Sequence, residues 1–261
     1  MNSERDPKIL SFIWTFGFVT AEAIGLRFSM QEPRVYRAMA RLRSEGAVGY
    51  KRLYRQYSGA YFLTRKGCRI AGLPVMKEPS LELVNYRHQL GVLMLGVEEM
   101  LRNGTQVLTE REMRLAASEG ETWSVRLPGQ RSAVRWPDLA LIDGTSTVAV
   151  ELELAAKRSV RLAQIIDGYE RQSTYSTVRF VVEQGAVAER IARITAGWRP
   201  GRSPNAVPAS RIQIEPWAKA PEPERIRRAA ERVLELPRQT SLWRELLTTQ
   251  INQQQKERDN D

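Results

Sequence analysis

The chain contains very little cysteine or histidine. Cys68 is the only cysteine and His88 the only histidine among its 261 residues. Disulfides within the chain and structural zinc clusters are therefore excluded, and there is little room for a Cys–His nucleophile or a Ser–His triad. Any catalytic chemistry must come mainly from carboxylates, lysine or hydroxyl groups.

Long apolar runs are also missing. No stretch approaches the roughly 18 to 20 consecutive apolar residues that span a bilayer, and the first residues, MNSERD, lack the pattern of a signal peptide. We therefore expect a cytoplasmic protein that does not bind membranes. With 42% hydrophobic residues, a chain of this length can build one large or two modest domains.

Positive charge is abundant and unevenly distributed. The net charge is +10, and residues 1–80 hold 14 Lys/Arg against 6 Asp/Glu. Residues 81–261 hold 26 against 24, so the first third carries most of the excess. A basic segment of this kind indicates a polyanionic partner.

The first third has the element order of a winged helix-turn-helix domain, which we place at residues 1–76. Thr20 and Ser29 are expected to cap the second and third helices. The run Tyr61–Gly67 resembles the strand-to-helix junction of bacterial winged-helix regulators. The expected elements are helices at 7–16, 21–28, 31–45 and from 64 onward, with strands at 48–55 and 60–63.

A winged helix places its third helix in the major groove and its wing along the neighbouring backbone. Glutamine and arginine bind adenine and guanine edges bidentately, which makes Gln31, Arg34 and Arg37 the expected base contacts. Duplex DNA is favoured over RNA, whose major groove is too deep and narrow. The alternatives are a solvated helix face or a module for protein contacts. The expected phosphate contacts are Arg41, Lys51, Arg52 and Arg55, with Tyr57 at the tip of the wing.

The most informative stretch is an acidic hairpin. Residues 138–142 and 147–154 alternate with the strand period, and the loop 143–146 pairs Ile142 with Thr147. Counting outward sets Asp138 opposite Glu151, with Cβ atoms roughly 5 Å apart. Two carboxylates at this distance repel each other unless a positive charge lies near.

A divalent metal would meet that need. Mg²⁺ and Mn²⁺ take oxygen ligands, so Asp138 and Glu151 are the expected metal ligands, with Glu153 as a further ligand or outer acid. Lys157 follows the strand, where its ammonium can stabilise charge on a phosphate. The alternative is an acidic face that simply lines the wet side of a half-buried hairpin.

Pro137–Asp138, Glu151–Leu–Glu153 and Lys157 resemble the PD-(D/E)xK nuclease superfamily. The resemblance implies a restriction-endonuclease-like domain at residues 80–220 that cleaves phosphodiesters with a bound metal. This chain departs from the pattern at Glu153, which stands where the family lysine is expected. Aligning Glu153 as the acidic member instead puts Ala155 at the lysine position, so Lys157 would have to act from a shifted place.

The chain also resembles the replication-relaxation family of plasmid and mobile-element proteins, through Arg87–Val92, a strand with Glu110–Glu112, and the acidic hairpin. The resemblance implies an α+β protein that acts on duplex DNA in replication, transfer or mobilisation. Two functions stay open: a metal-dependent DNA endonuclease, or a regulator or relaxosome accessory factor with a degenerate nuclease-like domain. The second form would use that domain for homodimerisation or partner docking. Residues 221–250 are expected to form C-terminal helices, and 251–261 a disordered tail.

Overall fold

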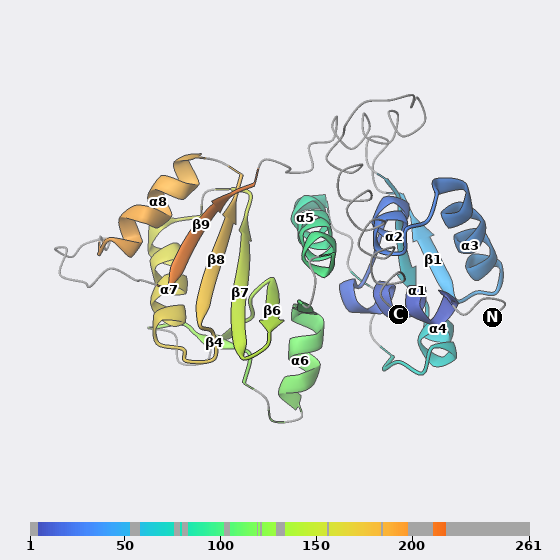
Figure 1. Ribbon diagram of the computed structural model, residues 1–261, viewed down its shortest axis with the longest axis horizontal. Helices are drawn as coiled ribbons and strands as arrows, with labels where there is room; N and C mark the ends of the chain where they lie inside the picture. The colour runs from blue at the N-terminus through green and yellow to red at the C-terminus, as the bar shows by residue number, and fades with distance from the viewer. Residues whose placement is uncertain are drawn as a thin grey trace, which may run out of the picture. The chain divides into compact units, whose positions relative to one another are not determined.

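The computed structural model describes residues 5–52, 58–75, 79, 83–101, 105–118, 120, 122–128, 134–155, 157–183, 185–197 and 211–217. These residues form an α+β protein (Figure 1) and divide into two compact units that separate between Val84 and Asn85. No helix in these ranges has the length and apolar character needed to cross a bilayer. The expected contacts Arg55 and Tyr57, the helices at 221–250 and the tail lie outside the described residues.

The first unit combines three helices with a two-stranded ribbon and a short fourth helix. The ribbon is antiparallel, and Val19 adds a bridge to Tyr61. One face of the third helix closes the core, where Val35, Met39 and Leu42 are fully buried. The elements are α1 (Arg5–Phe16), α2 (Ala21–Arg27), α3 (Glu32–Ser44), β1 (Val48–Lys51), β2 (Ala60–Leu63) and α4 (Arg65–Ile70).

Side-chain caps explain where two of these helices begin. The Thr20 hydroxyl accepts a hydrogen bond from the Ala23 amide at 3.2 Å, as expected, and Thr64 caps α4 in the same way. The expectation for α3 was wrong, because Gln31 is its N-cap and makes no side-chain capping bond. Ser29 instead adopts a φ of 50° in the preceding turn.

The second unit is built on a five-stranded mixed sheet in the order β3-β6-β7-β8-β9. The first three strands are antiparallel neighbours, whereas β7, β8 and β9 run parallel. The strands of the sheet are β3 (Gln106–Thr109), β6 (Leu139–Asp143), β7 (Ser146–Glu153), β8 (Thr177–Val182) and β9 (Ile212–Pro216). The other elements are helices α5 (Leu83–Met100), α6 (Glu110–Ser118), α7 (Ser159–Glu170) and α8 (Gly185–Thr195), and the small ribbon β4 (Val125–Arg126) and β5 (Val134–Arg135).

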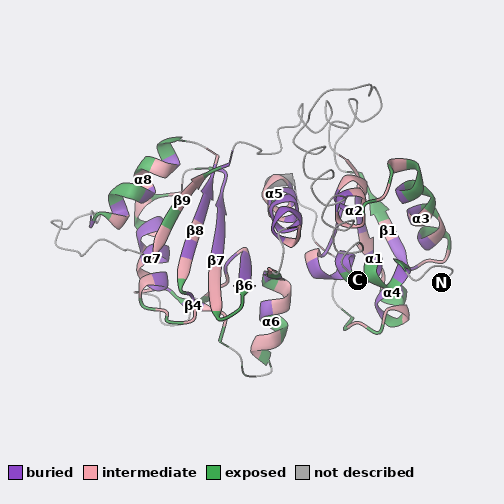
Figure 2. Cartoon of the chain, in the orientation of Figure 1, coloured by how far each residue is buried: buried purple, intermediate pink, exposed green. Residues whose placement is uncertain are grey.

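Helices cover both faces of this sheet. α7 and α8 lie on one face and α5 on the other (Figure 1). Apolar residues of α7 and α8 form one core with Ala140, Ala149 and Phe180. α5 approaches closely at Gly91, where a Cβ atom would lie 2.6 Å from the Leu152 side chain. As a result β7 and β8 are buried along most of their length (Figure 2).

The predicted hairpin register is confirmed, since Ile142 pairs with Thr147 and the strands continue to the pair Asp143–Ser146. Gly144 turns the chain with a φ of 57°, a region that favours glycine. The reading of a wet acidic face is wrong, because the side of the hairpin that carries Glu151 is covered by α7.

The expected strand containing Glu110–Glu112 is also wrong. The strand β3 ends at Thr109, and these residues open helix α6. The Thr109 hydroxyl and amide bind the Glu112 carboxylate, at 3.1 and 2.9 Å respectively. The Glu112 amide in turn donates to the Thr109 hydroxyl at 3.5 Å. This reciprocal pattern of a threonine followed three residues later by glutamate marks a helix start.

A buried ion pair joins α1 to α3. Both terminal nitrogens of Arg41 donate to the Asp6 carboxylate at 2.7 Å, and Asp6 is only 1% exposed. Arg41 keeps 29% exposure. The bidentate geometry gives Arg41 a structural task, in contrast to Arg37 on the exposed face of the same helix.

Replacing Arg41 with alanine should destabilise the first unit, because Asp6 would be left buried without its counter-charge. Such a loss costs about 3–5 kcal/mol when fully buried, and the partial exposure of Arg41 reduces our expectation to about 2 kcal/mol. Urea unfolding followed by circular dichroism measures it. Arg37→Ala is the matched control and should change stability by less than about 0.5 kcal/mol. Equal effects of the two variants would contradict a structural role for Arg41.

Candidate functional site

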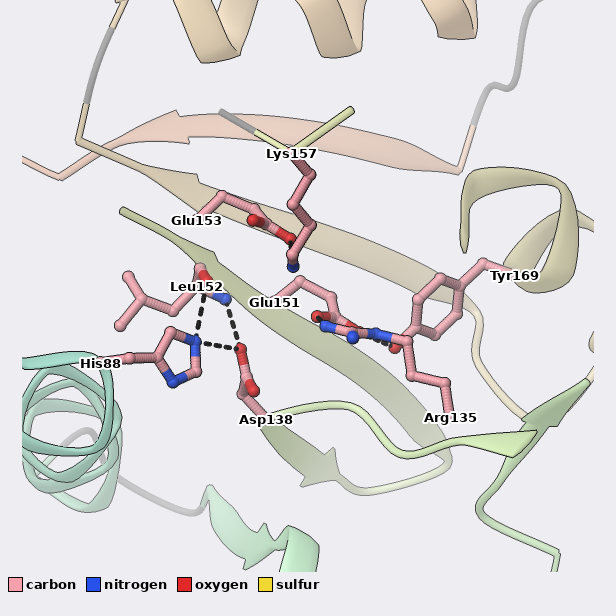
Figure 3. Close-up of polar contacts among 8 residues, drawn as sticks. All are labelled: His88, Arg135, Asp138, Glu151, Leu152, Glu153, Lys157 and Tyr169. Atoms are coloured by element: carbon pink, nitrogen blue, oxygen red, sulfur yellow. Dashed lines mark hydrogen bonds and ion pairs between the residues drawn. The ribbon is translucent and has the colours of Figure 1, made fainter. Parts of the chain in front are cut away.

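The hairpin and the helices around it bring together the acidic residues expected from the sequence. Register continues from the pair Leu139–Val150, so Asp138 lies beside Glu151. Glu151 and Glu153 are 0% and 3% exposed. Lys157 lies just beyond β7 and reaches back toward Glu153 (Figure 3). All four predicted site residues therefore gather near the end of β7.

Glu151 is fully engaged by two residues that the sequence did not indicate. Arg135 on β5 donates from Nε to Oε1 at 2.9 Å and from a terminal nitrogen to Oε2. The Tyr169 hydroxyl, from α7, also donates to Oε1. Burial and the adjacent carboxylate raise the pKa of Tyr169 well above its usual value, so the phenol keeps its proton and remains a donor.

Asp138 is held from the opposite side. Its Oδ2 accepts the Leu152 amide hydrogen at 2.8 Å and lies 3.3 Å from Nε2 of His88. Nε2 is also 3.0 Å from the Leu152 carbonyl oxygen. Because a carbonyl only accepts, Nε2 must carry a hydrogen. Burial acts to raise the pKa of Asp138, but His88, Arg135 and the backbone amide outweigh it and lower the pKa.

Glu153 pairs with Lys157, four residues further along the chain. The backbone of Lys157 is fixed in turn, since its carbonyl accepts a hydrogen bond from Arg190 at 2.8 Å. Burial raises the pKa of the Glu153 carboxyl, and the ammonium of Lys157 opposes this only in part. The lysine is thus held beside the very carboxylate that stands at the expected lysine position.

These carboxylates, as arranged, do not fit a divalent cation. Both oxygens of Glu151 are taken by a guanidinium, whose positive charge repels a metal ion. Within the described ranges, no three His, Cys, Asp or Glu side chains are grouped so that they could hold a metal. Asp138 and Glu151, the expected metal ligands, are therefore held in this structure by hydrogen bonds and ion pairs with protein groups.

A second surface of interest lies on α3. Arg34 and Arg37 are exposed on this helix, and Gln31 is exposed at its N-cap. Lys51 and Arg52 are exposed at the end of β1. All three expected base contacts and two of the expected phosphate contacts are therefore open to solvent, whereas Arg41 is held by Asp6.

Aromatic side chains accompany these basic groups. Tyr36 and Tyr50 are 49% and 38% exposed, the guanidinium of Arg43 lies 5.0 Å from the centre of the Tyr50 ring, and Tyr50 packs on Tyr61. Sequence reasoning did not single out Tyr36, although its position next to Arg37 on a helix with one apolar face places it outside the core.

Comparisons with protein-family models, with curated proteins and with solved structures gave no match.

The contact between His88 and Asp138 should make stability depend on pH. Burial acts to lower the pKa of His88, but Asp138 and the Leu152 carbonyl raise it above the ordinary 6.5. The contribution of protonated His88 to the free energy of unfolding is therefore fully present below pH 6.5 and is lost as pH rises through the folded-state pKa of His88. Asp138 has a lowered pKa, so its ionised carboxylate stabilises the fold above its ordinary pKa of 3.8. This stabilisation is lost as pH falls through the folded-state pKa.

The Tm values of wild type and His88→Gln should consequently differ most at about pH 5 to 6 and become similar toward about pH 9. Asp138→Asn serves as the matched variant. Its difference in Tm from wild type should also be largest at low pH and become smaller as pH rises, because the substitution removes the partner that favours the imidazolium. A gap that widens with rising pH would contradict the pairing.

Proposed function

We propose that the protein binds duplex DNA through α3 and the β1–β2 ribbon, arranged as a winged helix-turn-helix. The observation that carries the proposal is the two-sided character of α3. Val35, Met39 and Leu42 are fully buried, while Gln31, Arg34 and Arg37 are exposed. A helix anchored by one face and carrying arginine and glutamine on the other has the chemistry that reads base edges in a major groove.

The ribbon supplies the expected backbone contacts. Lys51 and Arg52 are exposed at the end of β1. Lysine binds phosphate through its single ammonium charge, and arginine binds it through two parallel hydrogen bonds from its planar guanidinium. The excess of 14 basic over 6 acidic residues in 1–80 supports the same partner. Arg41 is left out of this proposed surface because Asp6 occupies its donors.

For the second unit we propose a restriction-endonuclease-like scaffold that has lost catalysis and serves homodimerisation or partner docking. The internal neutralisation of Glu151 by Arg135 and the pairing of Glu153 with Lys157 support this role. The whole chain would then act in the cytoplasm as a regulator or accessory factor in plasmid replication, transfer or mobilisation. The resemblance to the replication-relaxation family suggests this setting.

A second candidate function is a nuclease dependent on Mg²⁺ or Mn²⁺. One observation favours it: Asp138, Glu151, Glu153 and Lys157 all meet near the end of β7, and the pKa of Asp138 is held below its usual value. The ionised carboxylate has the form that binds hard cations. Glu151 would first have to leave Arg135.

Arg34→Ala and Arg37→Ala should each weaken binding of the preferred duplex by about 5- to 150-fold, since a base contact is worth about 1–3 kcal/mol. The affinity for unrelated duplexes should fall less. Lys51→Ala should weaken all duplexes alike and reduce the slope of log K against log salt by about 0.9. Fluorescence anisotropy over a salt series measures both.

Arg69→Ala is the matched control, because Arg69 is an exposed arginine on α4 outside the proposed surface. It should leave affinity for the preferred duplex within about twofold. If wild-type protein binds duplexes no more tightly than Arg34→Ala and Arg37→Ala do, α3 is not the DNA-reading element.

The two roles of the second unit are separated by incubating supercoiled plasmid with Mg²⁺ or Mn²⁺ and wild-type or Asp138→Ala protein. We expect no nicking by either protein, with DNA binding retained by both. Nicking by wild type that disappears in Asp138→Ala would instead establish the nuclease. Calorimetric titration of each metal gives the matching binding measurement, and the scaffold predicts no heat of binding at the hairpin.

A further inference from the structure

The position of Arg135 is set by parts of the fold outside the acidic hairpin. Arg135 belongs to β5, which pairs with β4 through the partners Val125–Arg135. β4 lies tightly against α7, because a Cβ atom at Gly168 would stand 2.8 Å from the Arg126 carbonyl. The next residue, Tyr169, donates to Glu151. The small ribbon and α7 thus deliver a guanidinium and a phenol to one carboxylate.

The Glu151 carboxylate, which Arg135 and Tyr169 contact, is not accessible to water. Glu151 has 0% exposure, whereas Arg135 keeps 20%. An ionised carboxylate in such a place needs a counter-charge and a partner for each oxygen. Arg135 provides both through two donors held in one plane, and Tyr169 adds a third hydrogen bond.

Asp138 lies close enough to strengthen the effect. Its carboxylate lies beside Glu151 in the hairpin register, so the positive charge of Arg135 attracts it as well. Arg135 therefore balances Glu151 directly and shares the charge of Asp138 with His88. This is the electrostatic task that the sequence assigned to a metal ion between the same residues.

We propose that Arg135 is the resident cation of this site: its guanidinium replaces a divalent metal as the counter-charge of Glu151 and Asp138. The second unit then folds without metal, and a cation can enter only where Arg135 is removed. The inference rests on the scaffold role proposed for the second unit and is independent of DNA binding by the first.

The test uses the whole 261-residue chain, with thermal unfolding measured in EDTA, in Mg²⁺ and in Mn²⁺. Wild-type Tm should be the same in all three. Arg135→Ala should unfold about 6 to 20 °C lower in EDTA, because a buried carboxylate loses its partner. Mn²⁺ at about 100 times its Kd should then recover about 5 to 10 °C.

Two further variants keep the test decisive if Arg135→Ala fails to fold. Arg135→Met with Glu151→Gln removes both charges and leaves an amide carbonyl at position 151 that can still accept from Tyr169. This double variant should therefore fold, exceed either single variant in Tm and ignore Mn²⁺. Arg126→Ala is the matched control, since Arg126 is an exposed arginine on the partner strand β4. It should match wild type under all three conditions.

Three results would overturn the proposal. They are a rise in wild-type Tm with Mg²⁺ or Mn²⁺, a double variant no more stable than Arg135→Met or Glu151→Gln alone, and a folded Arg135→Ala that does not respond to Mn²⁺. Incubating the same samples with supercoiled plasmid and Mg²⁺ or Mn²⁺ distinguishes this failure from failure of the scaffold role. Nicking by wild type rejects the scaffold role, whereas the Tm comparison alone decides the role of Arg135.

Discussion

A carboxylate with no access to water has to be balanced inside the protein, and Glu151 imposes this condition on the second unit. Its partners come from two different places, Arg135 from the β4–β5 ribbon and Tyr169 from the last turn of α7. The carboxylate itself is fixed by the central strand β7. Burying an isolated charge costs several kcal/mol, so these three elements must be in register before the core around them can close.

The same reasoning separates the arginines of α3. Arg41 is drawn to the buried Asp6 and ties two helices together, while Arg34 and Arg37 stay at the surface. Within a few turns, this basic helix therefore carries an arginine that stabilises the fold and others that are exposed to solvent. The net charge of a segment overstates the number of groups that are open to a polyanion, because each buried acid removes one of them.

Regular patterns made much of this fold predictable. The alternation along β6 and β7, with a glycine turn between them, indicated the register that places Asp138 beside Glu151. The strand at Thr177–Val182 is likewise recognisable in the sequence, because it is a short apolar run rich in β-branched residues. The helix cap at Thr20 was readable because a hydroxyl stands directly before the helix.

The charge network was not predictable for equally physical reasons. β4 and β5 contain two residues each, which is too short to show any period, so nothing indicated that Arg135 would face Glu151. Glu110–Glu112 continue directly from β3, and only the return of Glu112 to Thr109 distinguishes helix from strand. His88 meets Asp138 through the packing of α5 on the sheet, a long-range contact that local sequence does not encode.

The topology around β7 also orders the events of folding. The β6–β7 hairpin is local and needs only a two-residue turn, whereas pairing of β7 with β8 waits for the crossover through α7. Tyr169 lies on that crossover, and Arg135 lies before the hairpin on a ribbon that packs against it. The early hairpin can therefore form with Glu151 still hydrated, and water leaves the carboxylate only when the parallel half of the sheet closes.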